Sequence, residues 1–382
     1  MHHADMVLVI NFFRITHRVE DEMQIAAGKY HSLLIASDGS VLFCGDNHKV
    51  CHTFDTTPCA LPTKMVIPIQ INSLAAGSLM SLFLDVDGNV WGCGDSQSGE
   101  LATNIPILTP EKLTGLSQIV SISVGMNHFS LFLDTSGRVW GCGTNNEGQL
   151  GTKNRCNHYS PTQILNIPRV TAISAGYAHT LLLGENGDVW ACGKNNYLQL
   201  GLDSDDTRVP QQIPDIPPMK SVSAGNDHSL LLDTDGNAWA FGKNNEGQLG
   251  LSHFYNLNPP EKITTLKQIT AIFAGNVYSV FLDINADPWI CGYNPMQKTY
   301  SGVPEYMVEL SNIQTVACGA YHLVFLDYDG CTWIIGANES YQLGTGDSKT
   351  RINPVLHETM PLVGRGDRFT KTKSARNKIT ER

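Results

Sequence analysis

Long hydrophobic runs are missing from this 382-residue chain, and so is any segment typical of a secretory signal. The most apolar stretch near its start, residues 6–13, is much shorter than the roughly 18 residues that a membrane-spanning helix needs. This stretch also lacks a basic beginning and a small-residue cleavage site. We interpret it as a strand and expect no membrane span.

Cysteine pairs with metal-site spacing are missing as well, because no two of the ten cysteines form a C-x-x-C motif. Five cysteines instead share one place, directly before a strand-ending glycine: Cys44, Cys93, Cys142, Cys192 and Cys291. Phe241 and Ile335 fill this place in two further copies, which indicates apolar packing. Unpaired thiols in this number indicate a reducing compartment. We expect an intracellular protein, cytoplasmic or nuclear or both.

Signatures of catalysis are also lacking. The chain has no P-loop, no nucleophile elbow and no H-E-x-x-H motif. Its glycine phrases lead into strands rather than helices, which excludes a dinucleotide-binding fingerprint. We expect no cofactor and no intrinsic catalytic chemistry.

Positive charge is scarce except at the C-terminal end. The net charge is −10, yet the residues from Gly364 onward carry seven basic against two acidic side chains, which leaves −15 for the remainder. An acidic body argues against specific DNA binding and favours a basic partner surface. The basic tail is interpreted as a disordered terminus, with contact to nucleic acid, acidic lipid or an import receptor as the alternatives.

What the sequence has in abundance is self-similarity. One phrase returns seven times: a small residue and glycine, two variable residues, usually histidine, an apolar run, a turn and a strand that ends in glycine. Successive copies begin 44 to 51 residues apart, and this period indicates a repeat architecture. The glycines that open the copies are Gly28, Gly77, Gly125, Gly176, Gly225, Gly275 and Gly319.

Each repeat contains four short strand candidates separated by turns rich in Gly, Asn, Asp and Pro. In the fourth copy the candidates are residues 161–165, 170–175, 179–183 and 188–192. Seven such units predict an all-β fold, a seven-bladed β-propeller of four-stranded antiparallel blades over residues 23–356. Residues 1–22 then form an N-terminal extension and residues 357–382 a basic tail.

Closure of the ring is expected to involve the C-terminal strand. Residues 352–356 match the first strand of an internal repeat, whereas the first copy begins abruptly at Met23 without such a strand. We therefore expect residues 352–356 to complete blade one and close the ring, with residues 6–13 as the rival strand.

Alternation of the strands sorts the loops onto two faces. The Gly-x-x-His loops and the long connections carrying Asn-Asn-Glu-Gly-Gln-Leu-Gly fall on one face, and the Asp-Gly turns fall on the other. Variable loops on a rigid frame are the usual place for recognition. The connections at 45–70 and 292–306 have lost the Gly-Gln-Leu-Gly phrase, which indicates either reshaping for a partner or drift.

Histidine recurs at one position of the repeat, in His31, His128, His179, His228 and His322. Met80 and Tyr278 fill this position in the other copies, and neither suits a zinc site or acid–base chemistry. Recurrence indicates that each histidine fixes its own loop, so we expect no metal site.

The two variable residues of each Gly-x-x-His loop would encircle one mouth of the ring. They include Tyr30, Leu79, Met126, Tyr177, Val277 and Tyr321. Tyr and Met are favoured in interface cores, so the mouth is a candidate partner-binding surface. Packing between neighbouring blades is the alternative.

These phrases resemble the regulator of chromosome condensation repeat family. The matching phrases are Ala-Gly-x-x-His-Ser/Thr, Gly-x-Val-Trp-x-Cys-Gly, and Asn-Asn-Glu-Gly-Gln-Leu-Gly at 145–151 and 244–250. The resemblance implies the propeller fold over residues 23–356. It specifies function less, because the family includes an exchange factor for the GTPase Ran, an ultraviolet photoreceptor, β-lactamase inhibitors and scaffolds in ubiquitin ligases and kinases.

Residue-by-residue comparison narrows these functions. The photoreceptor looks like a propeller with extra tryptophans in its loops, whereas all six tryptophans here share one strand position. The Ran exchange factor presents acidic loop residues and an inserted wedge to the GTPase, and only Asp227 matches such a position. Asp227 is alternatively a loop residue that accepts backbone hydrogen bonds.

The resulting hypothesis is a protein-interaction propeller that binds a small Ras-superfamily GTPase. Guanine-nucleotide exchange on Ran or a relative is the principal alternative, with Asp227 as its carboxylate. A substrate-recognition scaffold in a ubiquitin-ligase-like assembly is the further alternative.

Overall fold

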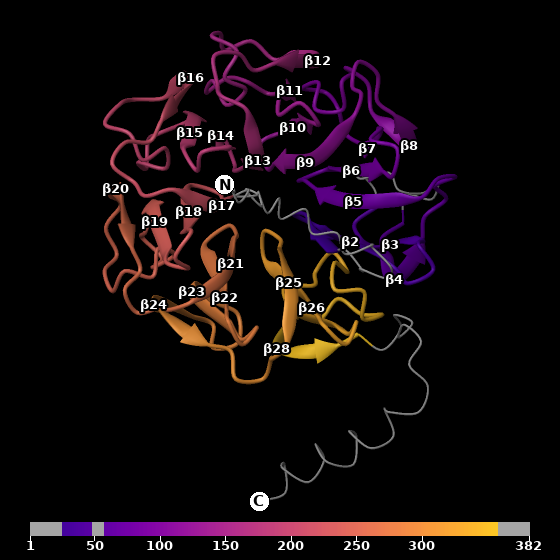
Figure 1. Cartoon of the computed structure of the whole chain (residues 1–382). Helices are drawn as coiled ribbons and strands as arrows, with labels where there is room; N and C mark the ends of the chain where they lie inside the picture. Colours follow the sequence, from indigo (N-terminus) through magenta and orange to yellow (C-terminus); the bar gives the residue numbers. More distant parts are fainter. Residues whose placement is uncertain (1–24, 48–56, 358–382) are drawn as a thin grey trace, which may run out of the picture.

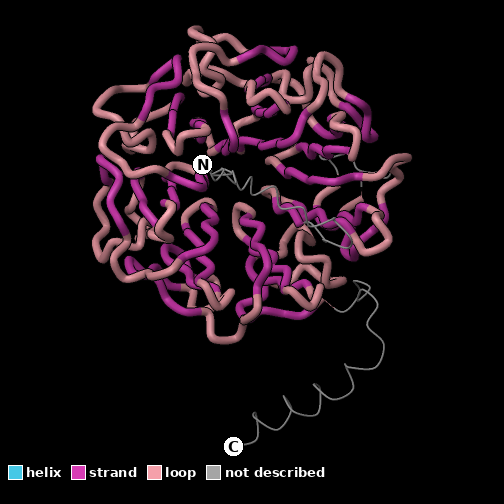
Figure 2. Tube along the Cα trace, in the orientation of Figure 1, coloured by secondary structure: helices cyan, strands magenta, loops and turns pink. Residues whose placement is uncertain are grey.

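Seven four-stranded antiparallel sheets are arranged as the blades of a ring (Figures 1 and 2). The computed structural model describes residues 25–47 and 57–357, and this part of the chain contains strands and loops but no helix. No segment of it is therefore a helix long and apolar enough to cross a membrane. The fold predicted from the repeats is confirmed.

Each blade uses four consecutive strands, from the innermost to the outermost. The first strands are β1 (Ile25–Ala27), β5 (Ile71–Ala76), β9 (Ile119–Gly125), β13 (Val170–Ala175), β17 (Met219–Ala224), β21 (Ile269–Ala274) and β25 (Ile313–Cys318). The second strands are β2 (His31–Ile35), β6 (Met80–Asp85), β10 (Phe129–Asp134), β14 (His179–Gly184), β18 (His228–Asp233), β22 (Tyr278–Asp283) and β26 (His322–Asp327). The third strands are β3 (Val41–Gly45), β7 (Val90–Gly94), β11 (Val139–Gly143), β15 (Val189–Gly193), β19 (Ala238–Gly242), β23 (Pro288–Asn294) and β27 (Thr332–Gly336). The fourth strands are β4 (Cys59–Lys64), β8 (Ile107–Lys112), β12 (His158–Gln163), β16 (Thr207–Gln212), β20 (Leu257–Lys262), β24 (Thr299–Tyr306) and β28 (Arg351–Leu356).

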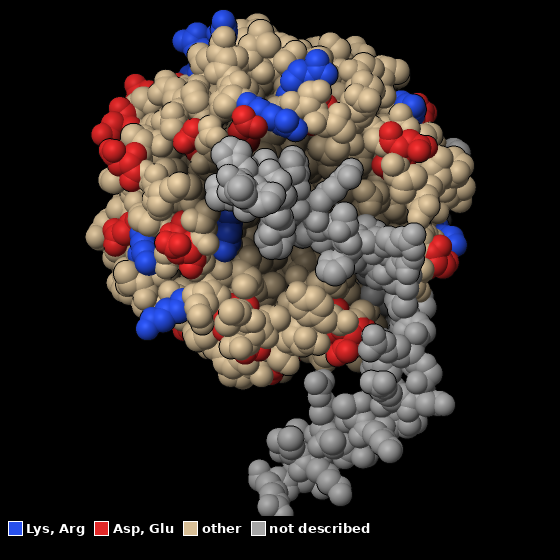
Figure 3. All heavy atoms as spheres, in the orientation of Figure 1, with Lys and Arg blue, Asp and Glu red and all other residues tan. Residues whose placement is uncertain are grey.

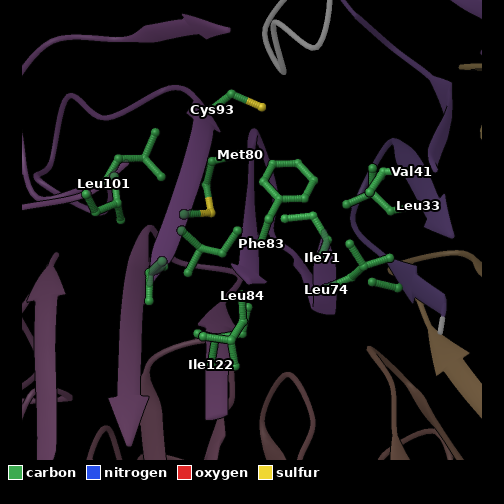
Figure 4. Packing of buried hydrophobic residues seen from close by; sticks show 14 of the residues in the cluster. Leu33, Val41, Ile71, Leu74, Met80, Phe83, Leu84, Cys93, Leu101 and Ile122 are labelled. Atoms are coloured by element: carbon green, nitrogen blue, oxygen red, sulfur yellow. The ribbon is translucent and has the colours of Figure 1, made fainter. Parts of the chain in front are cut away.

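The second strand of each blade is the most buried. Every residue of β10, β14 and β18 is buried, because neighbouring blades cover both faces of the sheet. A strand covered on both faces reads as a continuous apolar run rather than as an alternating pattern. Figure 4 shows this packing across the first three blades, where Leu33, Phe83 and Ile122 belong to one cluster.

Half-buried tryptophans on the third strands are anchored to the second strands. In five blades the indole Nε1–H donates to the aspartate that ends the second strand, as from Trp239 to Asp233 Oδ2 at 2.9 Å. In blade four Gly184 takes the place of that aspartate, and Trp190 Nε1 has no hydrogen-bond partner among the described residues. The Trp-rich position is therefore structural.

The boundaries of the blades differ from those predicted. Residues 158–163 pair with the preceding Trp strand, with Trp140 opposite Gln163, and so form the fourth strand of blade three rather than the first strand of blade four. Likewise β28 pairs with β27, with Trp333 opposite Leu356, and completes blade seven. The prediction that residues 352–356 complete blade one is wrong, because blade one has its own four strands. The rival segment 6–13 lies outside the described residues, as do residues 358–382 of the tail.

The ring closes by packing without strand exchange. Blades seven and one meet through Ala320 N–H, which donates to Gly28 O at 3.2 Å, and through Ser32 Oγ, which lies 2.8 Å from His322 Nε2. Bonds of the same two types join blades four and five. Closure therefore repeats an ordinary blade junction.

The assignment of loops to faces is unaffected by the shifted boundaries. The loop between the first and second strands and the connection between the third and fourth strands lie at the same end of a blade, because antiparallel strands reverse direction twice between them. Contacts confirm this: Glu100, in such a connection of blade two, bonds His128, in a Gly-x-x loop of blade three. We call this side of the ring the loop face.

Candidate functional site

Hydrogen bonds link the seven Gly-x-x loops into a continuous circle around the mouth of the ring. In five junctions a backbone N–H of one loop donates to a glycine carbonyl of the next, as Tyr177 N–H donates to Gly225 O at 3.2 Å. In the other two a side chain substitutes: Ser78 Oγ–H donates to Met126 O, and Tyr278 Oη–H donates to Gly319 O, each at 2.6 Å. The loops are therefore held rigidly relative to one another.

Close approach explains the glycine that opens each loop. A Cβ atom at Gly176 would lie 2.6 Å from Gly225 O of the next blade and would overlap the ring of His179. Such contacts are far shorter than carbon atoms tolerate. Glycine is needed here to let two loops and one imidazole meet.

The recurring histidines join neighbouring blades. Nε2 lies 2.8–3.0 Å from a serine hydroxyl of the next blade in His31, His179, His228 and His322. For His179, His228 and His322 the serine hydroxyl donates in turn to a backbone carbonyl, that of Gln199, Gln248 and Gln342, respectively. The imidazole Nε2–H is therefore the donor to serine. Burial lowers the pKa of His31, His179 and His228 to about 3 and that of His322 to about 4. These histidines are neutral and structural, but each fixes the next blade rather than its own loop.

The recurring cysteines share this arrangement. Cys44 Sγ lies 3.4 Å from Gln342 O and Cys291 Sγ lies 3.4 Å from Gln248 O, so each thiol contacts the carbonyl that also accepts the serine hydroxyl. Burial raises the pKa of Cys44, Cys142 and Cys192 to about 12. Such thiols are poor nucleophiles and poor metal ligands.

His128 departs from the structural role predicted for it. Phe129, not His128, pairs with the strand-ending Gly143 and packs over Gly125, in the place that His179 takes in blade four. The loop of blade three is one residue longer, and His128 adopts a φ of 56°. Its Nδ1 lies 2.9 Å from Glu100 Oε1, and this contact raises the pKa of His128. The sequence signal was present, because three residues separate Gly125 from Phe129 where other copies have two.

The mouth contains a cavity of about 480 Å³. Five of the six candidate partner-binding residues line it, namely Tyr30, Leu79, Met126, Tyr177 and Tyr321. Tyr177 and Tyr321 are 38% and 51% exposed, whereas Val277 packs against the core between blades six and seven. The structure therefore brings residues from five blades together around one opening.

Asp227 does not line this cavity. Its carboxylate accepts from Lys194 Nζ at 3.1 Å and from Gln199 Nε2 at 3.4 Å, and the residue is only 8% exposed. Lys194 in turn lies over the rings of Tyr177 and Tyr197, with its Nζ 5.9 and 5.0 Å from the centroids. Asp227 is therefore held in an ion pair at the rim, and its carboxylate is bonded by side chains rather than by the backbone groups of an Asx turn.

One of the two irregular connections is a hairpin. In blade six β23 and β24 continue past the usual end of the sheet, with Tyr293 opposite Tyr300 and their rings 5.5 Å apart. The other irregular connection, at 45–70, lies partly outside the described residues. On the side of the molecule in Figure 3, basic and acidic side chains are interspersed rather than gathered in one patch.

Comparisons with known proteins agree with this fold. The chain matches solved structures of human WBSCR16 (22% identity, TM-score 0.73, covering 79% of this chain and 85% of that one) and of Prp20p from Saccharomyces cerevisiae (21% identity, TM-score 0.74, covering 84% and 86%). No curated protein sequence matches the chain. The sequence model of the RCC1-like domain matches residues 10–309, which is more than half of the chain. The chain belongs to the family of RCC1-like domains.

Proposed function

We propose that this chain is an interaction propeller that binds a small Ras-superfamily GTPase through the mouth of the loop face. The observation that carries the proposal is the cavity at the mouth, where Tyr30, Tyr177 and Tyr321 stand with Leu79 and Met126 on a hydrogen-bonded frame. Rigid aromatic side chains around a concave centre are typical of binding hot spots. Prp20p, which shares the fold, has binding properties to Gsp1p and to histones, and this supports a GTPase as the partner.

Binding without catalysis agrees with the chemistry of the rim. A carboxylate that accelerates nucleotide exchange would compete for the lysine or the Mg²⁺ that hold the phosphates. Asp227 is already paired with Lys194, and the pair must open before the carboxylate reaches a partner. Exchange activity therefore stays the alternative, with Asp227 as its test residue.

Blade seven offers a matched pair of tyrosines for the experiment. Tyr321 precedes β26 and lines the cavity, whereas Tyr328 follows β26 on the opposite side of the ring and is 62% exposed. Binding to immobilised GTPases, loaded with GDP, loaded with a GTP analogue or free of nucleotide, is measured for the parent chain, Tyr321→Ala and Tyr328→Ala. We expect at least a ten-fold loss of affinity for Tyr321→Ala, as for a hot-spot side chain, and little change for Tyr328→Ala. No binding to any GTPase, or equal binding by the two variants, would reject the proposal.

Release of labelled GDP from the same GTPases separates binding from exchange. Accelerated release that Asp227→Asn abolishes would establish the exchange alternative. Binding without acceleration would leave the interaction propeller. Capture of ubiquitin-ligase subunits with no GTPase would favour the scaffold.

A further inference from the structure

Two departures from the repeat meet where blade two touches blade three. Glu100 stands where Gln149, Gln199, Gln248 and Gln342 stand in other blades, and the longer loop of blade three brings His128 against it. Each departure is small in the sequence. Together they place an imidazole and a carboxylate at one point of the loop face, in an arrangement that no other described junction has.

The change from glutamine to glutamate replaces a donor with an anionic acceptor. In the other copies the glutamine Oε1 accepts from the backbone N–H two residues earlier, as Gln199 does from Tyr197 at 2.9 Å. Glu100 keeps this bond, since its Oε2 accepts from Ser98 N–H at 3.0 Å. Its second oxygen, Oε1, takes the place of the amide nitrogen and faces His128. The side chain of Glu100 is 1% exposed, so this carboxylate has left water almost completely.

The junction between blades four and five also holds a largely buried carboxylate, and there a lysine balances it. There Lys194 follows the strand-ending Gly193 and pairs with Asp227 at 3.1 Å. At the junction of blades two and three, the residue after the strand-ending glycine is Asp95 instead. Within residues 25–47 and 57–357, no lysine or arginine forms an ion pair with Asp95 or Glu100. Where the other junction has an ammonium group, this one has a second carboxylate.

We propose that Asp95, Glu100 and His128 form a binding site for a divalent transition metal ion of the zinc type. One ligand atom from each residue lies within 4.8 Å of the other two. Tetrahedral zinc places its ligand atoms about 3.3–3.6 Å apart, given metal–ligand distances of about 2.0–2.2 Å, so modest side-chain rotations bring these three into range. The imidazole nitrogen favours zinc over Mg²⁺ or Ca²⁺, which prefer oxygen ligands alone.

The site is placed to act at the mouth. His128 lines the central cavity and its side chain is 31% exposed, whereas Glu100 lies behind it in the interior. Three protein ligands leave a tetrahedral ion with one further position, which water or a side chain from a bound partner fills. The proposal concerns the ion alone and holds whether or not the partner is a GTPase.

In the test, the full chain is first freed of metal with a chelator. It is then titrated with ZnCl₂, and binding is measured by calorimetry. Glu100→Gln restores the residue of the other repeats and is therefore expected to fold, while Glu246→Gln removes a carboxylate from the equivalent connection of blade five. We expect one zinc ion more per chain in the parent and in Glu246→Gln than in Glu100→Gln, with affinity for this ion reduced at least ten-fold by His128→Asn. Thermal stabilisation by zinc is expected to follow the same order, because a ligand that binds only the folded chain raises its stability.

Cobalt provides a readout that does not depend on any variant. Co²⁺ bound by one imidazole and two carboxylates gives tetrahedral visible bands without the charge-transfer band of a thiolate. Equal zinc stoichiometry and affinity in the parent and Glu100→Gln would overturn the proposal, as would a thiolate band, absence of saturable binding by the parent chain, or a preference for Ca²⁺ over Zn²⁺.

Discussion

Two buried serines that occupy the same repeat position differ in one bond, and this difference isolates the contribution of a bridging histidine. Ser279 Oγ–H donates to Gln248 O at 2.7 Å and accepts from His228 Nε2–H at 3.0 Å. Ser130 Oγ–H donates to Glu100 O at 2.7 Å, but Met80 stands in the histidine position of the blade before it. Both hydroxyls are fully buried.

Replacing each serine with alanine removes the same donor. In both variants a cysteine stays near the carbonyl, with Cys291 Sγ 3.4 Å from Gln248 O and Cys142 Sγ 3.5 Å from Glu100 O. Each carbonyl therefore keeps a weak partner, and the cost of this loss is about 1 kcal/mol. Only Ser279→Ala also leaves a buried imidazole N–H without an acceptor, which adds about 1–3 kcal/mol.

We therefore expect Ser279→Ala to lower the free energy of unfolding by about 2–4 kcal/mol and Ser130→Ala by about 1 kcal/mol. The assay is urea unfolding in metal-free buffer at pH 7.5, followed by intrinsic fluorescence, with calorimetry as a second probe. Since the entropy of unfolding scales with chain length, each kcal/mol corresponds to only about 1–2 °C for a chain of this size, so the denaturant midpoint is the more sensitive measure. Equal losses in the two variants, within about 0.5 kcal/mol, would refute a stabilising role for the histidine bridge.

Two further predictions follow from other buried groups. Burial lowers the pKa of His228 from about 6.5 in the unfolded chain to about 3 in the folded chain, so between these values the unfolded state binds more protons. The stability is therefore fully present above pH 6.5 and is lost as the pH falls below it. The loss is up to about 1.4 kcal/mol per pH unit for each such histidine. His228→Met, which introduces the residue that blade two has at this position, is expected to give a shallower fall in the urea midpoint between pH 7 and pH 5, and an unchanged slope would contradict the assignment. Trp239→Phe is expected to cost about 1–2 kcal/mol more than Trp190→Phe in the same unfolding assay, because only the former breaks a hydrogen bond to a carboxylate; a larger cost for Trp190→Phe would show that packing alone explains the position.

Much of the fold could be predicted because the repeat carries it seven times. The repeat predicts the number of blades and the number of strands in each blade. Strand alternation predicts that two sets of loops share one face. None of these predictions depends on where a repeat is said to begin. The blade boundaries do depend on that choice. Residues 158–163 lie between two Trp strands in the sequence, and no local pattern shows that they pair with Trp140 rather than with the strand that follows.

The candidate site was predictable to the extent that it follows the repeat. Tyr30, Met126 and Tyr321 could be placed at one mouth because each follows the glycine of its loop by one or two residues. The ion pair of Asp227 with Lys194 could not be predicted, because Lys194 belongs to the neighbouring blade. His128 was misassigned because it follows Gly125 by three residues, as the other histidines follow their glycines. In this blade, however, the pairing of the second strand begins one residue later, at Phe129.

The redundancy of the junctions indicates where function can be located. A histidine, a serine and a glutamine carbonyl join the blades at several junctions, so most of these hydrogen bonds serve only to hold the ring together. A junction can lose its histidine, as the one after Met80 has, because another bond between the loops, from Ser78 Oγ–H to Met126 O, remains. Such a junction is free to accept polar residues that stability does not require. Glu100 and His128 lie at this junction, where His128 lines the cavity and the carboxylate of Glu100 is buried behind it. A buried carboxylate is costly unless it is paired, and a metal ion bound between Glu100 and His128 would offset this cost.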